Sequence, residues 1–171
     1  LYAFVLRVGG AISFYGILKL LWPEQRRAAT LLALLFVTYP GFLQQPNANA
    51  YSNHLLGFFL GISSIALTLR AALVPSKLGT QILLGSLAAL FGVGCYLMME
   101  YMIGFEAVRL ILLWYALGRG QKRNLRLRAL QTFKRWLPTL SATTIFILWR
   151  VFIFKSARSV TDVRSLGKSY A

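Results

Sequence analysis

Long apolar runs separated by short polar connections dominate this sequence and constrain what it can fold into. Most of the runs have about the length that an α-helix needs to cross the ~30 Å hydrocarbon core of a bilayer. Hydrophobic residues make up 57% of the 171 residues and charged residues only 13%, whereas soluble domains contain about 45–50% and about 25% respectively. A chain of this size cannot enclose so much apolar surface in one globule, so we predict an integral membrane protein.

The runs predict an all-α fold, a polytopic transmembrane helical bundle with about six spans. The spans are expected at 1–22, 28–43, 55–74, 80–99, 103–117 and 136–154. Residues 118–136 contain many basic side chains, no acid, and apolar residues at three- and four-residue spacing, which predicts a separate basic helix lying in the membrane interface. We expect a transmembrane helical domain over 1–155, a polar basic tail over 156–171, and a chain that is part of a longer polytopic protein.

The span at 80–99 differs from the others in its small residues. Glycine and alanine recur there at spacings that allow helices to approach closely, such as Gly85 with Ala89. We therefore expect this span to be enclosed by other helices rather than to face lipid. It also contains Cys95, the only cysteine, for which we expect a buried structural thiol.

The charge pattern predicts how the chain is oriented. The net charge is +15, from 19 Lys and Arg against four acidic residues. Basic residues concentrate in alternate connections, whereas 44–53 between two spans has no charged residue, so we expect the basic loops to be cytoplasmic in a multi-pass protein of the cell inner (plasma) membrane. The expected partner of the basic face is a bilayer with anionic lipid. Nucleic acid is not expected, because the basic residues lie between membrane spans; the basic tail is an exception to this orientation.

Polar residues that would share the opposite, outer face form the candidate site. The candidate catalytic residues are Glu100 and Glu106, and the candidate ligand-binding residues are Gln44, Gln45, His54 and Arg109. Amides and carboxylates hydrogen-bond hydroxyl-rich ligands such as sugars, and a carboxylate can act as a general base. A structural interpretation is equally open: polar loops meet water, and Glu106 and Arg109 are three residues apart and can pair on one helix face. One histidine and one cysteine give no support for a metal site.

Several motifs carry a resemblance to known proteins. A helix ending in YPGFLQQP, the following Tyr-Ser-x-His helix start, and the stretches GFEAVRLILLW and LWRVFIF resemble poorly characterised bacterial polytopic membrane proteins. Those proteins are distantly similar to class C membrane glycosyltransferases, which use lipid-linked sugar donors. The resemblance covers about residues 22–155 and implies a site on the outer face. In that class the base is usually an acidic residue early in the first outer loop, so the resemblance carries over no catalytic residue.

The sequence leaves three functions open and does not settle whether the protein is an enzyme. The first is sugar transfer from a polyprenyl-phosphate donor at the outer face. The second is a non-catalytic structural or accessory subunit of a larger membrane complex, respiratory or photosynthetic, in which His54 could bind a pigment. The third is a transporter with Arg7, Glu106 and Arg109 along its path, which lacks the paired broken helices typical of such folds. No cofactor is predicted.

Overall fold

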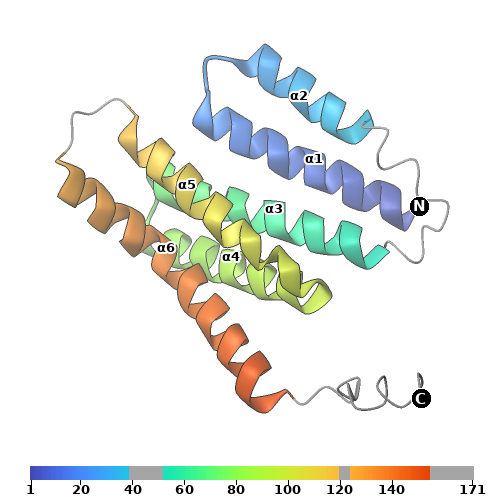
Figure 1. The fold of residues 1–171 in the computed structure, drawn as a ribbon. Helices are drawn as coiled ribbons and strands as arrows, with labels where there is room; N and C mark the ends of the chain where they lie inside the picture. Colours follow the sequence, from blue (N-terminus) through green and yellow to red (C-terminus); the bar gives the residue numbers. More distant parts are fainter. Residues whose placement is uncertain (39–51, 120–123, 155–171) are drawn as a thin grey trace, which may run out of the picture.

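The computed structural model of the protein describes residues 1–38, 52–119 and 124–154, and in these ranges it contains helices and no strand. The elements are α1 (Tyr2–Leu21), α2 (Arg26–Thr38), α3 (Ser52–Leu73), α4 (Leu78–Met98), the 3₁₀ helix η2 (Glu100–Gly104), α5 (Phe105–Gly118), α6 (Leu125–Leu148) and the π-helical turn η3 (Trp149–Ile153). Successive α-helices run in alternating directions (Figure 1), so the turns after α1 and α3 and the end of α5 lie at one end of the bundle. The predicted all-α fold is confirmed.

Five helical segments are long and apolar enough to cross a membrane. They are Tyr2–Leu21, Ser52–Leu73, Leu78–Met98, Glu100–Gly118 and Leu125–Ile153. Six spans are not confirmed, because α2 has 13 residues and ends at Thr38, and the far end of the predicted span at 28–43 lies outside the described residues. The fold is therefore that of a membrane-embedded helical protein.

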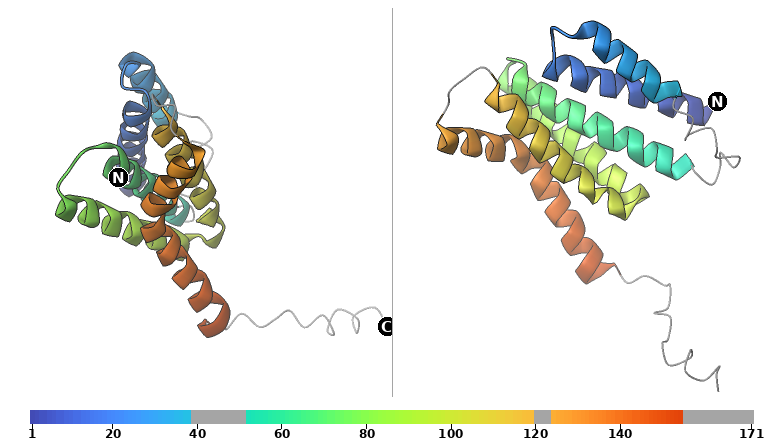
Figure 2. Two further views of the ribbon diagram at one scale, coloured as in Figure 1. Left: turned by 90° about the vertical axis from the view of Figure 1, so that its left-hand side faces the viewer. Right: turned by 45° about the horizontal axis from the view of Figure 1, so that its top comes forward.

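The separate basic interfacial helix predicted at 118–136 is wrong. From Leu125 onward these residues form the first half of α6, which continues without a break through the expected last span. Pro138 lies inside α6, and the helix changes direction part-way along its length (Figure 2). Proline has no N–H to donate and its ring clashes with the carbonyl four residues earlier, so it bends a helix without ending it. The basic residues thus belong to one arm of a bent helix.

Arg128 attaches this basic arm to the end of α5. Its Nε donates to the backbone carbonyl of Trp114 at 3.0 Å, and its guanidinium lies 4.3 Å from the centre of the Trp114 ring. The arginine thus makes a hydrogen bond and a cation–π contact with the same residue near the end of α5. At the start of α6, the Asn124 side chain accepts from the backbone N–H of Arg126 at 3.1 Å.

The helix α3 is the centre of the bundle, with α1 on one side and α4 and α5 on the other. A buried apolar cluster joins α1, α3 and α5, made of Ile17, Leu21, Ile62, Ile65, Leu69 and Leu113. Half of the apolar window of α3 is buried, against 22% for α4. The expectation that 80–99 is enclosed is therefore wrong for one side of α4, where Leu83 and Leu90 are exposed. Cys95 lies on the packed side and is buried, as expected.

A glycine of α3 approaches neighbouring side chains more closely than any glycine of α4 does. Gly61 is buried, and a Cβ added there would lie 2.6 Å from Cδ2 of Phe105 and 3.1 Å from Sγ of Cys95. The Phe105 ring is itself held against Phe58, with ring centres 5.7 Å apart. We expect Gly61→Ala to lower the free energy of unfolding by about 1–3 kcal/mol, because a packed ring has to move. Thermal unfolding of the detergent-solubilised protein measures this.

Gly79 provides the matched control for this substitution. It lies in the first turn of α4, and no atom lies within 4 Å of an added Cβ. Gly79→Ala is expected to leave stability unchanged or to raise it by up to about 1 kcal/mol, because alanine favours the helix. An equal loss of stability in both variants would contradict the assignment of Gly61 as a close-packing position.

Candidate functional site

Glu106 and Arg109 lie inside the bundle, on the same face of α5. Arg109 Nη2 is 3.2 Å from Glu106 Oε1, which confirms the predicted pair at three-residue spacing. Arg109 is 0% exposed and Glu106 is 7% exposed. Charged groups at this depth are costly in a membrane protein unless other polar groups surround them, so their remaining contacts decide what the pair can do.

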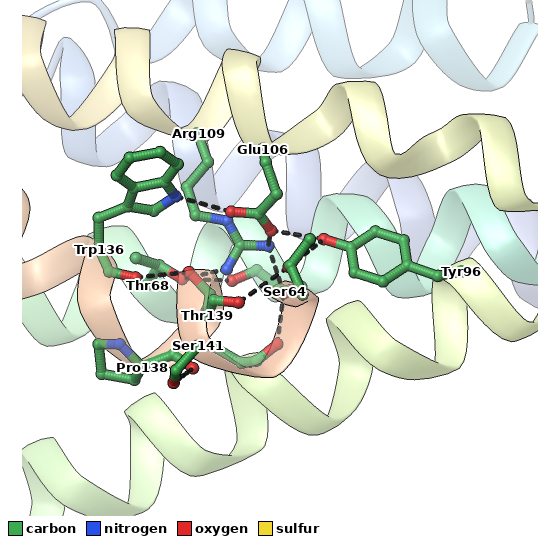
Figure 3. Close-up of polar contacts among 11 residues, drawn as sticks. Ser64, Thr68, Tyr96, Glu106, Arg109, Trp136, Pro138, Thr139 and Ser141 are labelled. Atoms are coloured by element: carbon green, nitrogen blue, oxygen red, sulfur yellow. Dashed lines mark hydrogen bonds and ion pairs between the residues drawn. The ribbon is translucent and has the colours of Figure 1, made fainter. Parts of the chain in front are cut away.

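Arg109 reaches from α5 to two hydroxyl groups on α3 (Figure 3). Its Nη2 donates to Ser64 Oγ at 2.7 Å and its Nη1 donates to Thr68 Oγ1 at 3.0 Å. Ser64 passes the connection on to α4, because its hydroxyl donates to the backbone carbonyl of Ala88 at 2.5 Å. Of the three guanidinium nitrogens of Arg109, Nε is the one that has no hydrogen-bond partner among the described residues.

Glu106 is held by donors from the two other neighbouring helices. The hydroxyl of Tyr96 in α4 donates to Oε1 at 2.5 Å, and the indole N–H of Trp136 in α6 donates to Oε2 at 2.7 Å. Thr143 of α6 hydrogen-bonds the same Tyr96 hydroxyl at 3.2 Å. We call Ser64, Thr68, Tyr96, Glu106, Arg109, Trp136 and Thr143 the buried polar network. It joins α3, α4, α5 and α6, and it gives both carboxylate oxygens of Glu106 a protein partner.

A second polar group lies at the exposed end of the bundle, opposite the basic connections. Glu100, in η2, forms an ion pair with Arg150 in η3, and 57% of its side chain is exposed. The next residue, Tyr101, is also exposed, and its hydroxyl lies 2.8 Å from Nδ1 of His54, near the start of α3. We call His54, Glu100, Tyr101 and Arg150 the outer cluster. It consists of two contacts, Glu100 with Arg150 and His54 with Tyr101, which are linked by the adjacent positions of Glu100 and Tyr101 in η2.

The structure therefore divides the predicted site residues between two places. Glu100 and His54 belong to the outer cluster through their separate contacts with Arg150 and Tyr101, whereas Glu106 and Arg109 belong to the buried polar network. Arg109 is enclosed by protein partners there, which differs from the predicted position on an outer binding face. Gln44 and Gln45 lie outside the described residues. No described contact joins the two carboxylates.

Sequence reasoning did not identify the partners of the ion pair. Ser64 and Thr68 gave a usable signal, because two hydroxyl residues four apart share one face of an otherwise apolar span. Tyr96 and Trp136 gave none, since aromatic residues are common near membrane surfaces and their contacts depend on how the helices pack. Arg150 could not be matched to Glu100 for the same reason.

Neither a metal nor a known relative indicates the chemistry. Among the described residues, no group of three or more histidine, cysteine, aspartate or glutamate side chains could hold a metal ion. No protein family, curated protein or solved structure matches the chain. The comparisons therefore give no indication of the function.

Proposed function

We propose that the protein is part of a glycosyltransferase-like membrane scaffold that acts on a polyprenyl-phosphate sugar at its outer face. The observation that carries this proposal is the outer cluster, which gathers Glu100, Arg150, Tyr101 and His54 at the end of the bundle away from the basic connections. The glutamate there is solvent-accessible, unlike Glu106. The choice of donor comes from the sequence motifs, which resemble poorly characterised bacterial membrane proteins that are distantly similar to class C glycosyltransferases.

Each side chain of the outer cluster has a chemical role in this proposal. The Glu100 carboxylate accepts the proton of an acceptor hydroxyl, while the acceptor oxygen bonds to the anomeric carbon and the polyprenyl phosphate leaves with the electron pair of the broken C–O bond. Arg150 exchanges its contact with Glu100 for the phosphate, since guanidinium groups bind phosphate oxygens in pairs. The bond between His54 and Tyr101 fixes the position of the Tyr101 phenol, the residue after Glu100 in η2.

The proposal includes an orientation in the bacterial inner membrane. The described basic residues at the connection end are Lys19, Arg26, Arg27, Arg70, Lys77, Arg119, Arg126, Arg128, Lys134 and Arg135. At the other end the described basic residues near the helix termini are Arg7 and Arg150. An excess of lysine and arginine marks cytoplasmic connections, so the basic end is proposed to be cytoplasmic and the outer cluster to face the opposite side.

Cysteine labelling tests this orientation. In a Cys95→Ser background, which removes the buried thiol, we introduce Asn53→Cys at the start of α3 or Lys77→Cys just before α4. A membrane-impermeant maleimide added to the outside of spheroplasts is expected to label the first variant, and the second only after permeabilisation. Both positions are exposed, so accessibility to solvent is matched. The reverse labelling would contradict the proposed orientation.

Native mass spectrometry of the solubilised full-length particle tests the function itself. A monomer or dimer that carries polyprenyl-phosphate lipid is the expected result. Purified particles are also expected to transfer labelled sugar from a synthetic polyprenyl-phosphate donor to added membrane extract. A fixed assembly with several other subunits, no such lipid and no transfer would overturn the proposal.

That second outcome corresponds to a non-catalytic accessory subunit, which one observation favours. Glu106 and Arg109 are committed to contacts within the bundle, and the end of α6 with η3 exposes a series of large apolar side chains. They are Ile145, Leu148, Val151, Phe152, Ile153 and Phe154. Lipid or a neighbouring subunit would cover this surface, and in an accessory subunit the outer cluster would be a docking surface.

A further inference from the structure

A groove between α1 and α3 has apolar walls and a basic end. Its volume is about 790 Å³. The walls include Ile12 of α1 and Phe59 of α3, together with Phe91 of α4. At the end near the helix connections, three cationic side chains line it: Lys19, Arg26 and Arg70. We call this feature the α1–α3 groove; it lies at the opposite end of the bundle from the outer cluster.

The three cations of the groove have no acidic partner among the described residues. The ion pairs in the described part of the chain are Glu106 with Arg109 and Glu100 with Arg150, and none of these four residues lines the groove. Glu24 is at the same end but is exposed and does not line the groove. The helix α2 also begins at Arg26, so the partial positive charge of its first turn adds to the same region. Like charges gathered in this way favour an anion between them.

The length of the groove matches one leaflet of a bilayer. Along α1 it extends from Lys19 back to Gly9, which both line it. Ten residues of α-helix are about 15 Å long, and half of the ~30 Å hydrocarbon thickness is also about 15 Å. The groove is open at Gly16, where no atom lies within 4 Å of an added Cβ, whereas the Phe59 ring fills the space beside Gly9. The groove is therefore long enough for an acyl chain that starts at the basic end to extend as far as Gly9.

We propose that the α1–α3 groove binds an anionic phospholipid from the leaflet at the basic end. The phosphate lies between Lys19, Arg26 and Arg70, and one acyl chain follows the apolar walls toward Gly9 and Phe59. Basic pockets between transmembrane helices on the cytoplasmic side are suited to anionic lipid headgroups. This site is separate from the proposed sugar-transfer site and does not depend on it.

Thermal unfolding with defined lipids tests the site. The full protein is delipidated in neutral detergent, and its Tm is measured with added phosphatidylglycerol or with phosphatidylcholine of the same chains. Phosphatidylglycerol is expected to raise Tm by several degrees more than phosphatidylcholine does. The triple variant Lys19→Gln, Arg26→Gln, Arg70→Gln is expected to lose this difference, and native mass spectrometry should show one fewer bound phosphatidylglycerol.

The matched control removes the same number of charges from the same end of the bundle. Arg27, Lys77 and Arg126 are exposed and do not line the groove. The triple variant Arg27→Gln, Lys77→Gln, Arg126→Gln is expected to keep the phosphatidylglycerol-specific shift. If both triple variants lose the shift equally, the lipid responds to overall charge and the proposed site is wrong. Equal stabilisation of the unmodified protein by both lipids would also overturn it.

A second variant tests the acyl-chain position without changing charge. No atom lies within 4 Å of a Cβ added at Gly16, which lines the groove. The side chain of Gly16→Leu therefore begins in open space within the groove, and this variant is expected to abolish the phosphatidylglycerol-specific shift. If the shift persists in Gly16→Leu, no acyl chain occupies the groove. This variant decides the matter even if the groove triple variant fails to fold in detergent.

Discussion

Replacing Glu106 by glutamine is expected to lower the free energy of unfolding by about 3–5 kcal/mol, because it leaves the Arg109 cation buried without its counter-charge. Arg109 is 0% exposed and Glu106 lies 3.2 Å from it. Glutamine keeps the volume of glutamate, so the loss would report charge and hydrogen bonding rather than a cavity. Its amide group would also place a donor among the donors of Tyr96, Trp136 and Arg109.

The comparison with two further variants makes this result specific. Glu100→Gln removes a carboxylate that is also ion-paired but largely exposed, and it is expected to cost at most about 1 kcal/mol. The double variant Glu106→Gln, Arg109→Met removes both buried charges and is expected to recover much of the loss, since neighbouring substitutions that share an interaction are not additive. Unfolding in detergent or mixed micelles gives all three values. If Glu106→Gln is no more harmful than Glu100→Gln, the buried polar network does not stabilise the bundle.

Glu100→Gln is expected to reduce sugar transfer by about 10²-fold or more while the protein stays folded, because general-base catalysis contributes about 10²–10⁴-fold. From the sequence alone, Glu100 and Glu106 were equivalent candidates for the catalytic carboxylate. The structure separates them: Glu100 is accessible, whereas Glu106 is 7% exposed and surrounded by three side-chain donors. A loss of transfer in Glu106→Gln would be accompanied by a loss of stability.

The control for Glu100 is the other exposed glutamate. Glu24→Gln changes a carboxylate in the turn between α1 and α2, at the opposite end of the bundle, and is expected to leave transfer unchanged. Transfer rates are compared at equal amounts of folded protein, judged by size-exclusion profile and Tm. Wild-type transfer by folded Glu100→Gln would mean that the base is not Glu100 and that the outer cluster has a different role.

Much of the fold could be predicted because membrane spans depend on composition and length, which are local properties. The predicted runs at 1–22, 55–74 and 80–99 agree with α1, α3 and α4 to within a few residues. The last two elements were harder. A basic amphipathic pattern followed by an apolar pattern fits two separate helices as well as one bent helix. Only Pro138 and the way it packs distinguish these two possibilities. The pairing of Glu106 with Arg109 was predictable, since three-residue spacing fixes it.

The contacts between helices could not be predicted from the same information. Each helix has one face that meets neighbours, and lipid-facing and protein-facing residues are both apolar, so hydrophobicity does not say which face is which. This is why α4 was expected to be enclosed when α3 is the central helix. It is also why Glu106 was assigned to an outer surface: its charge identified it as important, but the depth of Glu106 depends on Tyr96 and Trp136, which come from other helices.

The buried polar network has a consequence for how the chain is made. Synthesis proceeds from the N-terminus, so the hydroxyl groups of α3 and the Tyr96 phenol are already in the bilayer when α5 emerges with its two charges. Most of the other members of the network are thus made before α5, and Trp136 and Thr143 of α6 are made after it. Apart from Trp136, the side chains that bond Glu106 and Arg109 thus come before α5 along the chain.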